Sequence, residues 1–535
     1  MIVSVALIPL MIRIAPRLGM VDNPDARKVH LAPIPRAGGV GIAIGALIPV
    51  LIWAPSGPAM HAYLAASLIL LGFGMWDDAR TLGAAVKFLG QFFAAVIVVY
   101  YGRVYVLSLP FMNLHQLPLY FAQPFTVFAL VGMINALNVS DGLDGLAGGL
   151  SILSLGAIAY LALQTSGYAA VAIALATLGG VLGFMRYNTH PARVFMGDAG
   201  SQFLGFTLGF LAVYLLQYVN SALSPALPLL ILGLPIADLL AVIAQRFYLG
   251  ISPFVATKHH VHHRLLASGF DHYEAVVIIY VIQTAFIVLA LLMRYDADSA
   301  IFTVYLGICG LLFLFLFVMA HLGLKVHASR APSRLSTAIG AIRNHPLFHA
   351  TPVFVITLFV PLLFLAVGLF TREVPRDFGV GATVLAVLLV LHLVFSGMND
   401  SIVLRAISYV TAAFVIYLES KYLTGRTPLL NTAETGYFIV LAAAIGLAVR
   451  YGTGTAVEFR TTPMDYLVIL IVLSVGLLTG DSTHRAYIGA MTIKLVIVFY
   501  GCEFITSRMK SRWNLLNLSS LATLAILGAR GLGLA

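Results

Sequence analysis

Long apolar segments alternate with short polar loops along the whole chain. At roughly 20 residues per crossing, about 17 of these segments approach the length that spans a bilayer as an α-helix. The first eleven are expected near 1–16, 38–54, 62–76, 87–101, 121–137, 147–164, 168–185, 200–218, 225–244, 273–293 and 300–322. About six or seven more follow between residues 350 and 530. The pattern predicts an all-α, polytopic membrane protein with a core of about 11 helices and an additional C-terminal set of helices.

Composition supports the same fold class. Hydrophobic residues make up 60% of the 535 residues, charged residues only 10%, and the mean hydropathy is +0.98. Soluble globular domains carry far more charge, and an outer-membrane barrel would show short alternating segments that this sequence lacks. The first apolar stretch, Met1 to Ala15, has neither a basic n-region nor a clear cleavage site. We therefore expect a short first transmembrane helix there rather than a signal peptide.

Basic residues gather in a few of the short loops and predict the orientation. The loop 17–37 carries four of them and is expected on the cytoplasmic side. Alternation of the segments then places four more loops on that side: 77–86, 138–146, 186–199 and 245–272. These four loops hold all the motifs with chemical character, so we expect one shared site at the cytoplasmic face. The net charge of +10 follows this membrane rule and does not indicate a nucleic-acid partner.

Five aspartates lie at the ends of apolar segments in a chain that otherwise avoids charge. They are Asp77, Asp78, Asp141, Asp144 and Asp198. A carboxylate near the bilayer core is costly and normally marks function. Five acids brought together would repel one another, and a divalent cation with a phosphorylated substrate would relieve that repulsion. For the adjacent pair in MWDDAR, a solvated position at the membrane interface is the alternative.

The stretch NALNVSDGLDGLAGG presents polar residues in steps of three. Asn135, Asn138, Asp141 and Asp144 would share one face if the helix continued through them. Two carboxamides and two carboxylates on one stripe can bind a hydrated cation and the polar parts of a nucleotide. The neighbouring glycines would allow close approach of a ligand or another helix. A polar seam for helix packing is the alternative.

Two further motifs contain residues that could bind an anion, a metal ion or a base. In NTHPARVFMGDAGS, Asp198 stands before an apolar helix, and such a helix N-terminus can face an anion or a metal-bound phosphate. Phe195 offers a stacking face for a base, or simply an interface aromatic. The run KHHVHHR, Lys258 to Arg264, forms an anion-binding cluster, with zinc binding or a solvated loop as alternatives. Together these parts indicate metal-assisted phosphoryl transfer at a membrane face.

The order of motifs resembles a known family. DD, NxxNxxDGxDGLA, VFMGDxGS and HxHHRL occur as in the polyprenyl-phosphate N-acetylhexosamine-1-phosphate transferases, over about residues 1–325. The resemblance implies an Mg²⁺-dependent enzyme, with Mn²⁺ as an alternative, in the bacterial inner membrane with its site facing the cytoplasm. A UDP-N-acetylhexosamine would be the donor, polyprenyl (undecaprenyl) phosphate the acceptor and UMP the leaving product. The bilayer is the other expected partner, nucleic acid is not expected, and a homodimer is left open.

The resemblance also implies roles for single residues. Asp77 and Asp78 match the paired acids that activate the lipid phosphate or place the metal. Asp198 matches the Mg²⁺ ligand, and Asp141 and Asp144 match residues that line the nucleotide and metal site. The expected metal ligands are therefore Asp198, Asp141 and Asp144.

Other residues match family positions that bind the substrate. The motif histidines His260, His262 and His263 are expected to contact the pyrophosphate and are counted with the catalytic acids. The residues expected to bind substrate are Lys28, Lys87, Asn135, Asn138, Asp141, Asp144, Asn188, Phe195 and Arg264.

The run SPFxxxKHHVHHRLLASGF looks like the branch that transfers N-acetylglucosamine 1-phosphate. A phospho-MurNAc-pentapeptide transferase is the alternative within the family. The acid that usually precedes the matched histidines is absent, and Thr257 and Lys258 stand there instead. A lipid-linked-sugar transporter is the alternative from another class, but it would place its acids near the bilayer midplane in repeated halves.

Domain organisation follows from where the motifs stop. We expect a transferase core over 1–325, a basic cytoplasmic linker over 326–349, and an additional transmembrane domain over 350–535. No catalytic motif occurs in the last segment, where polar points such as Glu419 are isolated.

Overall fold

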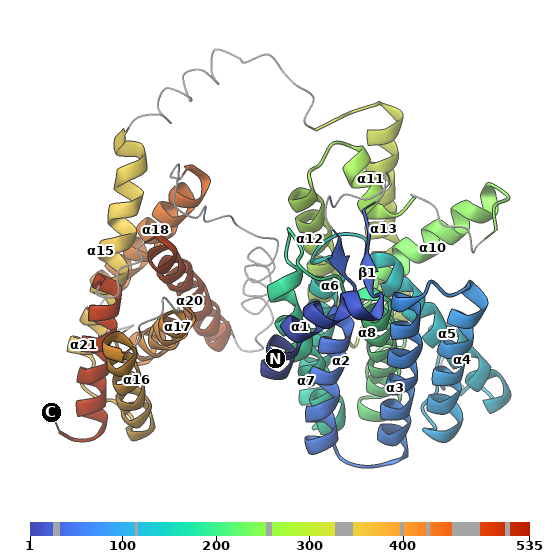
Figure 1. Cartoon of the computed structure of the whole chain (residues 1–535), viewed down its shortest axis with the longest axis horizontal. Helices are drawn as coiled ribbons and strands as arrows, with labels where there is room; N and C mark the ends of the chain where they lie inside the picture. Colours follow the sequence, from blue (N-terminus) through green and yellow to red (C-terminus); the bar gives the residue numbers. More distant parts are fainter. Residues whose placement is uncertain are drawn as a thin grey trace. The chain divides into compact units, whose positions relative to one another are not determined.

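The computed structural model describes residues 1–24, 33–112, 116–252, 259–326, 346–395, 401–423, 428–451, 482–508 and 514–534. Helices dominate this part of the chain, and the strands described are the antiparallel pair β1 (Val21–Asp22) and β2 (Ile34–Pro35). The all-α, polytopic prediction is confirmed. The chain divides into two compact units, which for the described residues are 1–326 and the segments from 346 onward (Figure 1).

The first unit contains a helix at each of the eleven predicted positions. They are α1 (Ile2–Ile14), α2 (Gly38–Trp53), α3 (Pro58–Ala79), α4 (Ala84–Val96), α5 (Leu119–Ser140), α6 (Leu146–Leu163), α7 (Tyr168–Asn188), α8 (Gly197–Tyr214), α10 (Gly233–Tyr248), α12 (His272–Leu292) and α13 (Asp298–His321). Shorter elements are η1 (Ala15–Leu18), α9 (Pro228–Ile231) and α11 (Val261–Ala267), and π-turns η2 (Ile97–Tyr101) and η3 (Leu215–Val219) extend α4 and α8.

Ten of the described helices are long and apolar enough to cross a membrane. They include α3, α5, α6, α7, α12 and α13, together with α4 and α8 when their π-turns are counted. The predicted segment 225–244 is interrupted, because α9 ends at Ile231 and α10 begins at Gly233. Helices α1, α2 and α10, with 13, 16 and 16 residues, are not among the ten, so the predicted spans agree with the structure at the other eight positions of the first unit.

Helix α8 lies at the centre of the first unit. Its residues are buried from Ala199 to Ala212, and it packs against α2, α3 and α5. The contacts with α2 and α3 are made backbone to backbone. A Cβ atom on Gly74 of α3 would lie 2.4 Å from Cα of Ala199, and one on Gly39 of α2 would lie 2.1 Å from N of Gly200. Glycines allow helices to approach this closely, and they fix α8 beside the end of α3.

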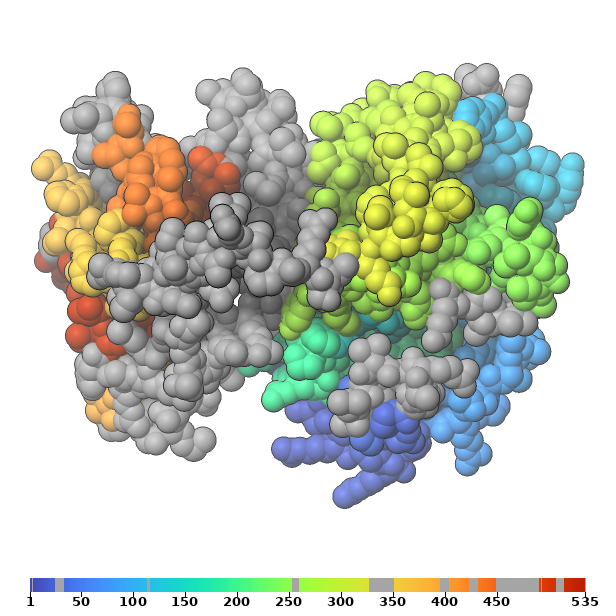
Figure 2. Space-filling view, turned by 90° about the horizontal axis from the view of Figure 1, so that it is seen from above, coloured from blue at the N-terminus to red at the C-terminus, as the bar shows by residue number. Residues whose placement is uncertain are grey.

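The predicted motifs meet at one end of the first unit. The last turn of α3 contacts the first turn of α8, and so does the last turn of α5. The last residue of α7 contacts the turn before α6, which is also the turn that meets the start of α12. Figure 2 looks onto the molecule from above Figure 1 and shows blue, green and yellow segments side by side on this face of the first unit. Elements far apart in sequence therefore contribute to one region.

The second unit contains six described helices, where six or seven were predicted. They are α15 (Pro346–Phe370), α16 (Arg376–Phe395), α17 (Ser401–Leu418) with its π-turn η4 (Glu419–Leu423), α18 (Pro428–Tyr451), α20 (Ser482–Arg508) and α21 (Leu515–Gly531). This unit has its own hydrophobic core, which includes Phe364, Val415 and Leu441.

Candidate functional site

Lys87 connects two of the predicted acids. Its Nζ forms an ion pair with the carboxylate of Asp77 and lies 3.5 Å from Oδ2 of Asp198. Asp77 also accepts a hydrogen bond of 2.6 Å from the backbone N–H of Leu82. The Asp77 side chain is only 2% exposed, whereas that of Lys87 is 33% exposed. A single cation, reachable from outside, is thus shared by acids of α3 and α8.

Asn138 holds Asp198 from another side. Its Nδ2 donates to Oδ1 of Asp198 at 2.6 Å and to Oγ of Ser201 at 2.7 Å. Helices α4, α5 and α8 therefore converge on one carboxylate, and Ser201 is a contributor that the sequence analysis did not single out. A carboxylate fixed by a lysine and a carboxamide is preorganised, because the neighbouring side chains limit its rotation.

Asp78 has a different environment from Asp77. Its Oδ1 accepts from the backbone N–H of Asp198 at 2.8 Å, and its Oδ2 accepts from the N–H of Ala199 at 3.0 Å. The expectation that the N-terminus of α8 faces an anionic ligand is therefore wrong for these two N–H groups, because Asp78 already occupies them. Gly197 has φ +71°, and a Cβ atom there would lie 2.5 Å from Oδ2 of Asp78.

The expected helical stripe does not continue as predicted. Helix α5 ends at Ser140, Asp141 has the non-helical angles φ −83° and ψ 55°, and Asp144 lies in the turn before α6. The turn is possible because Gly145 adopts φ +81°, a left-handed conformation that glycine tolerates best. Within the helix, Asn135 donates to Oε1 of Gln91 at 2.7 Å, so it joins α5 to α4.

The Asp141 carboxylate is half-buried and accepts no hydrogen bond from the residues that the structure describes. Burial raises its pKa to about 7, and the negative charges of Asp198 and Asp144 act in the same direction. A carboxylate that is destabilised in this way is suited to a cation. Oxygen ligands are those that Mg²⁺ prefers, so Asp141 and Asp198 fit the predicted metal.

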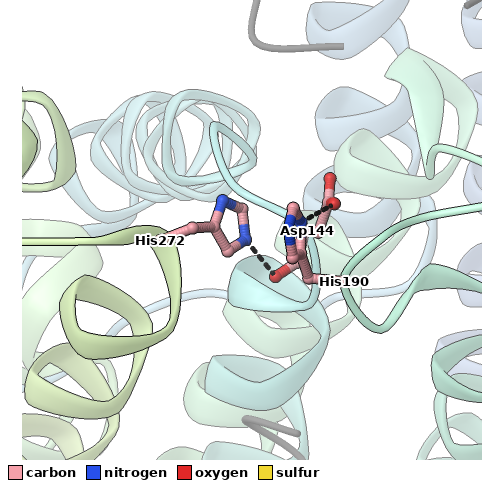
Figure 3. A group of neighbouring side chains, drawn as sticks. All are labelled: Asp144, His190 and His272. Carbon is pink, nitrogen blue, oxygen red and sulfur yellow. Dashed lines mark hydrogen bonds and ion pairs between the residues drawn. The ribbon is translucent and has the colours of Figure 1, made fainter. Parts of the chain in front are cut away.

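Asp144, the third predicted metal ligand, contacts two histidines. Its Oδ2 lies 2.6 Å from Nδ1 of His190 and accepts from the N–H of Ala192 at 3.0 Å, while Nε2 of His272 lies 3.4 Å from its backbone oxygen. The two imidazole rings stack with centroids 4.1 Å apart (Figure 3). Neither histidine was predicted from the sequence to be a site residue. His190 stands inside a motif that was recognised, but nothing local distinguishes His272.

Asn188 and Phe195 hold the loop before α8. Asn188 is buried, accepts from the N–H of Gly145 at 2.9 Å, and donates to the carbonyl of Val194 at 2.9 Å. Phe195 is half-buried, and its backbone N–H donates to the carbonyl of Pro35 at 2.8 Å. These contacts fix the loop, and the predicted nucleotide-binding roles of both residues stay predictions.

The histidine motif is anchored by an acid that the sequence analysis missed. Asp238 of α10 lies 3.0 Å from Nδ1 of His260 through Oδ2, and its Oδ1 accepts from the N–H of Val261 at 2.9 Å. Asp238 is buried in an apolar helix. That position was the available signal, because an acid inside such a helix normally has a partner or a function. Arg264 donates to Oε1 of Gln245 at 2.6 Å and so also contacts α10.

His262 lies against the acidic turn. A Cβ atom on Gly142 would lie 2.2 Å from its Nε2, so only glycine fits there. Burial, helped by the charge of His263, lowers the pKa of His262 to about 3. His262 is therefore neutral at physiological pH and can act as a hydrogen-bonding group.

Some predictions fall outside the described residues. They concern Lys28 of the first loop, Thr257 and Lys258 before the histidine motif, and residues 327–345 of the predicted basic linker.

Known proteins resemble the chain over this region. The model of the glycosyl transferase family 4 matches residues 60–216. A protein of Bacillus subtilis (strain 168), named probable undecaprenyl-phosphate N-acetylglucosaminyl 1-phosphate transferase, is 37% identical over 317 residues, which are 58% of this chain and 87% of that protein. The decaprenyl-phosphate N-acetylglucosaminephosphotransferase of Mycobacterium tuberculosis (strain CDC 1551 / Oshkosh) is 35% identical over 50% of this chain and 74% of its own length. The undecaprenyl-phosphate alpha-N-acetylglucosaminyl 1-phosphate transferase of Escherichia coli (strain K12) is 30% identical, with the same two coverages.

Proposed function

Since the chain belongs to glycosyl transferase family 4, we propose that it transfers N-acetylglucosamine 1-phosphate to a polyprenyl phosphate in the membrane. The donor is a UDP-N-acetylhexosamine, and UMP is released. The relatives' names support the acceptor and the transferred group. The transfer starts the assembly of a lipid-linked glycan on the cytoplasmic side of the bacterial inner membrane.

One observation carries the proposal. Asp77, Lys87, Asn138 and Asp198 come from four helices and meet at one end of the first unit. Phosphoryl transfer depends mainly on positioning and on charge neutralisation. A lysine shared by two acids and a carboxylate held by a carboxamide supply a fixed arrangement for a pyrophosphate substrate.

The reaction joins two phosphates. An oxygen of the polyprenyl phosphate attacks the phosphorus that carries the sugar, the pyrophosphate bond breaks, and UMP leaves with that electron pair. A phosphate monoester has a second pKa of about 6, so the acceptor is largely dianionic at neutral pH and needs no strong base. Lys87 attracts the incoming phosphate, and neutral His262 orients the substrate by hydrogen bonding. Asp198 and Asp141 would hold Mg²⁺, which neutralises pyrophosphate charge when bound.

The test is UMP release from purified full-length protein with undecaprenyl phosphate and Mg²⁺. UDP-N-acetylglucosamine is expected to be the best donor in a panel that includes UDP-N-acetylgalactosamine and UDP-MurNAc-pentapeptide. Asp198→Asn should abolish release, because the carboxamide cannot replace the charge at the metal. Asp296→Asn, which changes an exposed acid at the far end of α12, is the matched control and should leave turnover unchanged. Near-normal turnover of Asp198→Asn would remove Asp198 from the metal site, and preference for the pentapeptide donor would assign the alternative activity.

A further inference from the structure

Asp144, His190 and His272 form a compact group of metal-ligating side chains. In the part of the chain that the structure describes, this is the one group of three His, Cys, Asp or Glu whose ligand atoms all lie within 4.8 Å of one another. The three residues come from different places: the turn before α6, the segment after α7, and the first residue of α12. Figure 3 shows both imidazole rings beside Asp144.

The chemistry of this group differs from that of the Mg²⁺ ligands. Two imidazole nitrogens and one carboxylate suit a borderline transition metal such as Zn²⁺, whereas Mg²⁺ prefers oxygen ligands only. Three protein ligands leave one position of a tetrahedral zinc ion for water. We propose that Asp144, whose predicted role was to bind Mg²⁺ with Asp141 and Asp198, forms a second, zinc-type metal site with His190 and His272 instead.

The ligands are held in place by their neighbours. Asp271 and Glu274 form a reciprocal capping box that fixes the first turn of α12, where His272 is the first residue. The hydroxyl of Tyr273 donates to the backbone oxygen of His190 at 3.3 Å. These contacts fix the backbone that carries the two histidines.

A metal ion can reach the group from solvent. The side chains of His190 and Asp144 are 28% and 16% exposed, so the site is neither sealed nor fully hydrated. Nδ1 of His190 and Oδ2 of Asp144 lie 2.6 Å apart. A zinc ion bound by both residues takes the place of this direct contact.

Occupancy would affect the neighbouring acids. Asp144 and Asp141 stand in the same turn, and the charge of Asp144 acts on Asp141. Zinc held by Asp144 would neutralise this charge. Zinc binding itself does not rest on the proposed function.

The test is calorimetric titration of chelator-treated, full-length protein with Zn²⁺ in excess Mg²⁺, together with the visible absorption of Co²⁺ as a probe of tetrahedral coordination. One zinc equivalent is expected. His190→Ala and His272→Ala should each weaken binding at least about tenfold and remove the cobalt bands. His61→Ala, at an exposed histidine of α3, is the matched control and should bind normally.

The outcomes separate the alternatives. Unchanged zinc affinity in the double variant of His190 and His272, or loss of zinc in His262→Ala instead, would overturn the site. His272→Gln gives a second variant if His272→Ala unfolds, and metal-free melting curves show which variants fold. Zinc bound with these ligands by a protein that releases no UMP from any donor would contradict the proposed function while the zinc site stands.

Discussion

At the scale of single residues, the two adjacent acids at the end of α3 have different surroundings. Asp77 pairs with Lys87, whereas both oxygens of Asp78 accept hydrogen bonds from backbone N–H groups of α8. Asp78 therefore caps the start of α8 beside Asp198, and the catalytic role predicted for it stays a prediction. Sequence alone treats the two acids alike, because it does not show which partner each will meet.

Asp78→Ala should lower kcat for UMP release, with little change in KM for the donor. The loss of a cap of this kind destabilises a helix start by about 0.5–2 kcal/mol, and Asp198 would lose its fixed position. Asp78→Asn keeps one accepting oxygen and should recover part of the activity. The measurement is steady-state kinetics with melting temperatures in detergent. If folded Asp78→Asn were as inactive as Asp198→Asn, the charge of Asp78 would be needed for chemistry, against a positioning role.

The raised pKa of Asp141 predicts how metal binding depends on pH. In the metal-free protein a proton competes with Mg²⁺ below the pKa of about 7. Affinity for Mg²⁺ should therefore rise about tenfold from pH 6 to pH 8 and level off above that range. Calorimetric titration with Mg²⁺ at several pH values measures this. Asp141→Asn should bind Mg²⁺ more weakly and lose this pH dependence, and an unchanged profile in the variant would assign the titration to another group.

At the scale of helices, close packing decides where the acids lie. Helices α3 and α8 meet at Gly74 and Ala199, one turn from Asp78 and beside Asp198. The hydrophobic pattern predicts that both helices exist, but it does not predict that they touch here. A glycine in an apolar segment has no distinctive local signal.

Gly74→Ala should destabilise the protein and reduce UMP release. The new Cβ atom would lie 2.4 Å from Cα of Ala199, so the helices must separate, and overpacking of this kind typically costs about 1–3 kcal/mol. Gly72→Ala on the same helix is the matched control, since a Cβ atom there meets nothing within 4 Å. Melting temperature and turnover are measured together. Equal behaviour of the two variants would show that the contact with α8 does not position the site.

At the scale of the whole molecule, the first unit contains the predicted site, and the second unit contains a buried cluster of charged side chains of its own. In the second unit, Lys494 of α20 lies 3.0 Å from Oε1 of Glu419 and also pairs with Glu434 of α18. The side chains of Lys494 and Glu419 are 13% and 5% exposed. A mostly buried cation between two acids stabilises the packing of the helices that carry them only while all three are present.

Lys494→Met should destabilise the second unit by about 3–5 kcal/mol, because it leaves two acids without their cation. UMP release should persist, since every predicted catalytic residue lies in the first unit. Limited proteolysis monitors the second unit while turnover monitors the first, and Lys421→Met at an exposed lysine is the control. Loss of turnover together with unfolding of the second unit would contradict the independence of the two units.

Much of this protein could be predicted from the amino-acid order. Hydropathy predicted the helices, because each transmembrane helix must be apolar over a bilayer's thickness whatever its neighbours are. The spacing of DD, DGLDG and MGDAGS predicted the acids of the site and the family. These are local properties, and each can be recognised within about 20 residues.

Only tertiary structure determined which groups meet. Asp144 contacts His190, 46 residues away, and His272, 128 residues away. No local sequence pattern predicts either contact. The sequence marks Asp238 as an acid in an apolar helix but does not show that His260 is its partner, and it does not show that α5 ends before Asp141. The physical reason is that hydrogen bonds and charge interactions act over a few ångströms. Whether a given carboxylate binds a proton, a lysine, a backbone N–H or a metal therefore depends on which helix ends packing brings within that distance.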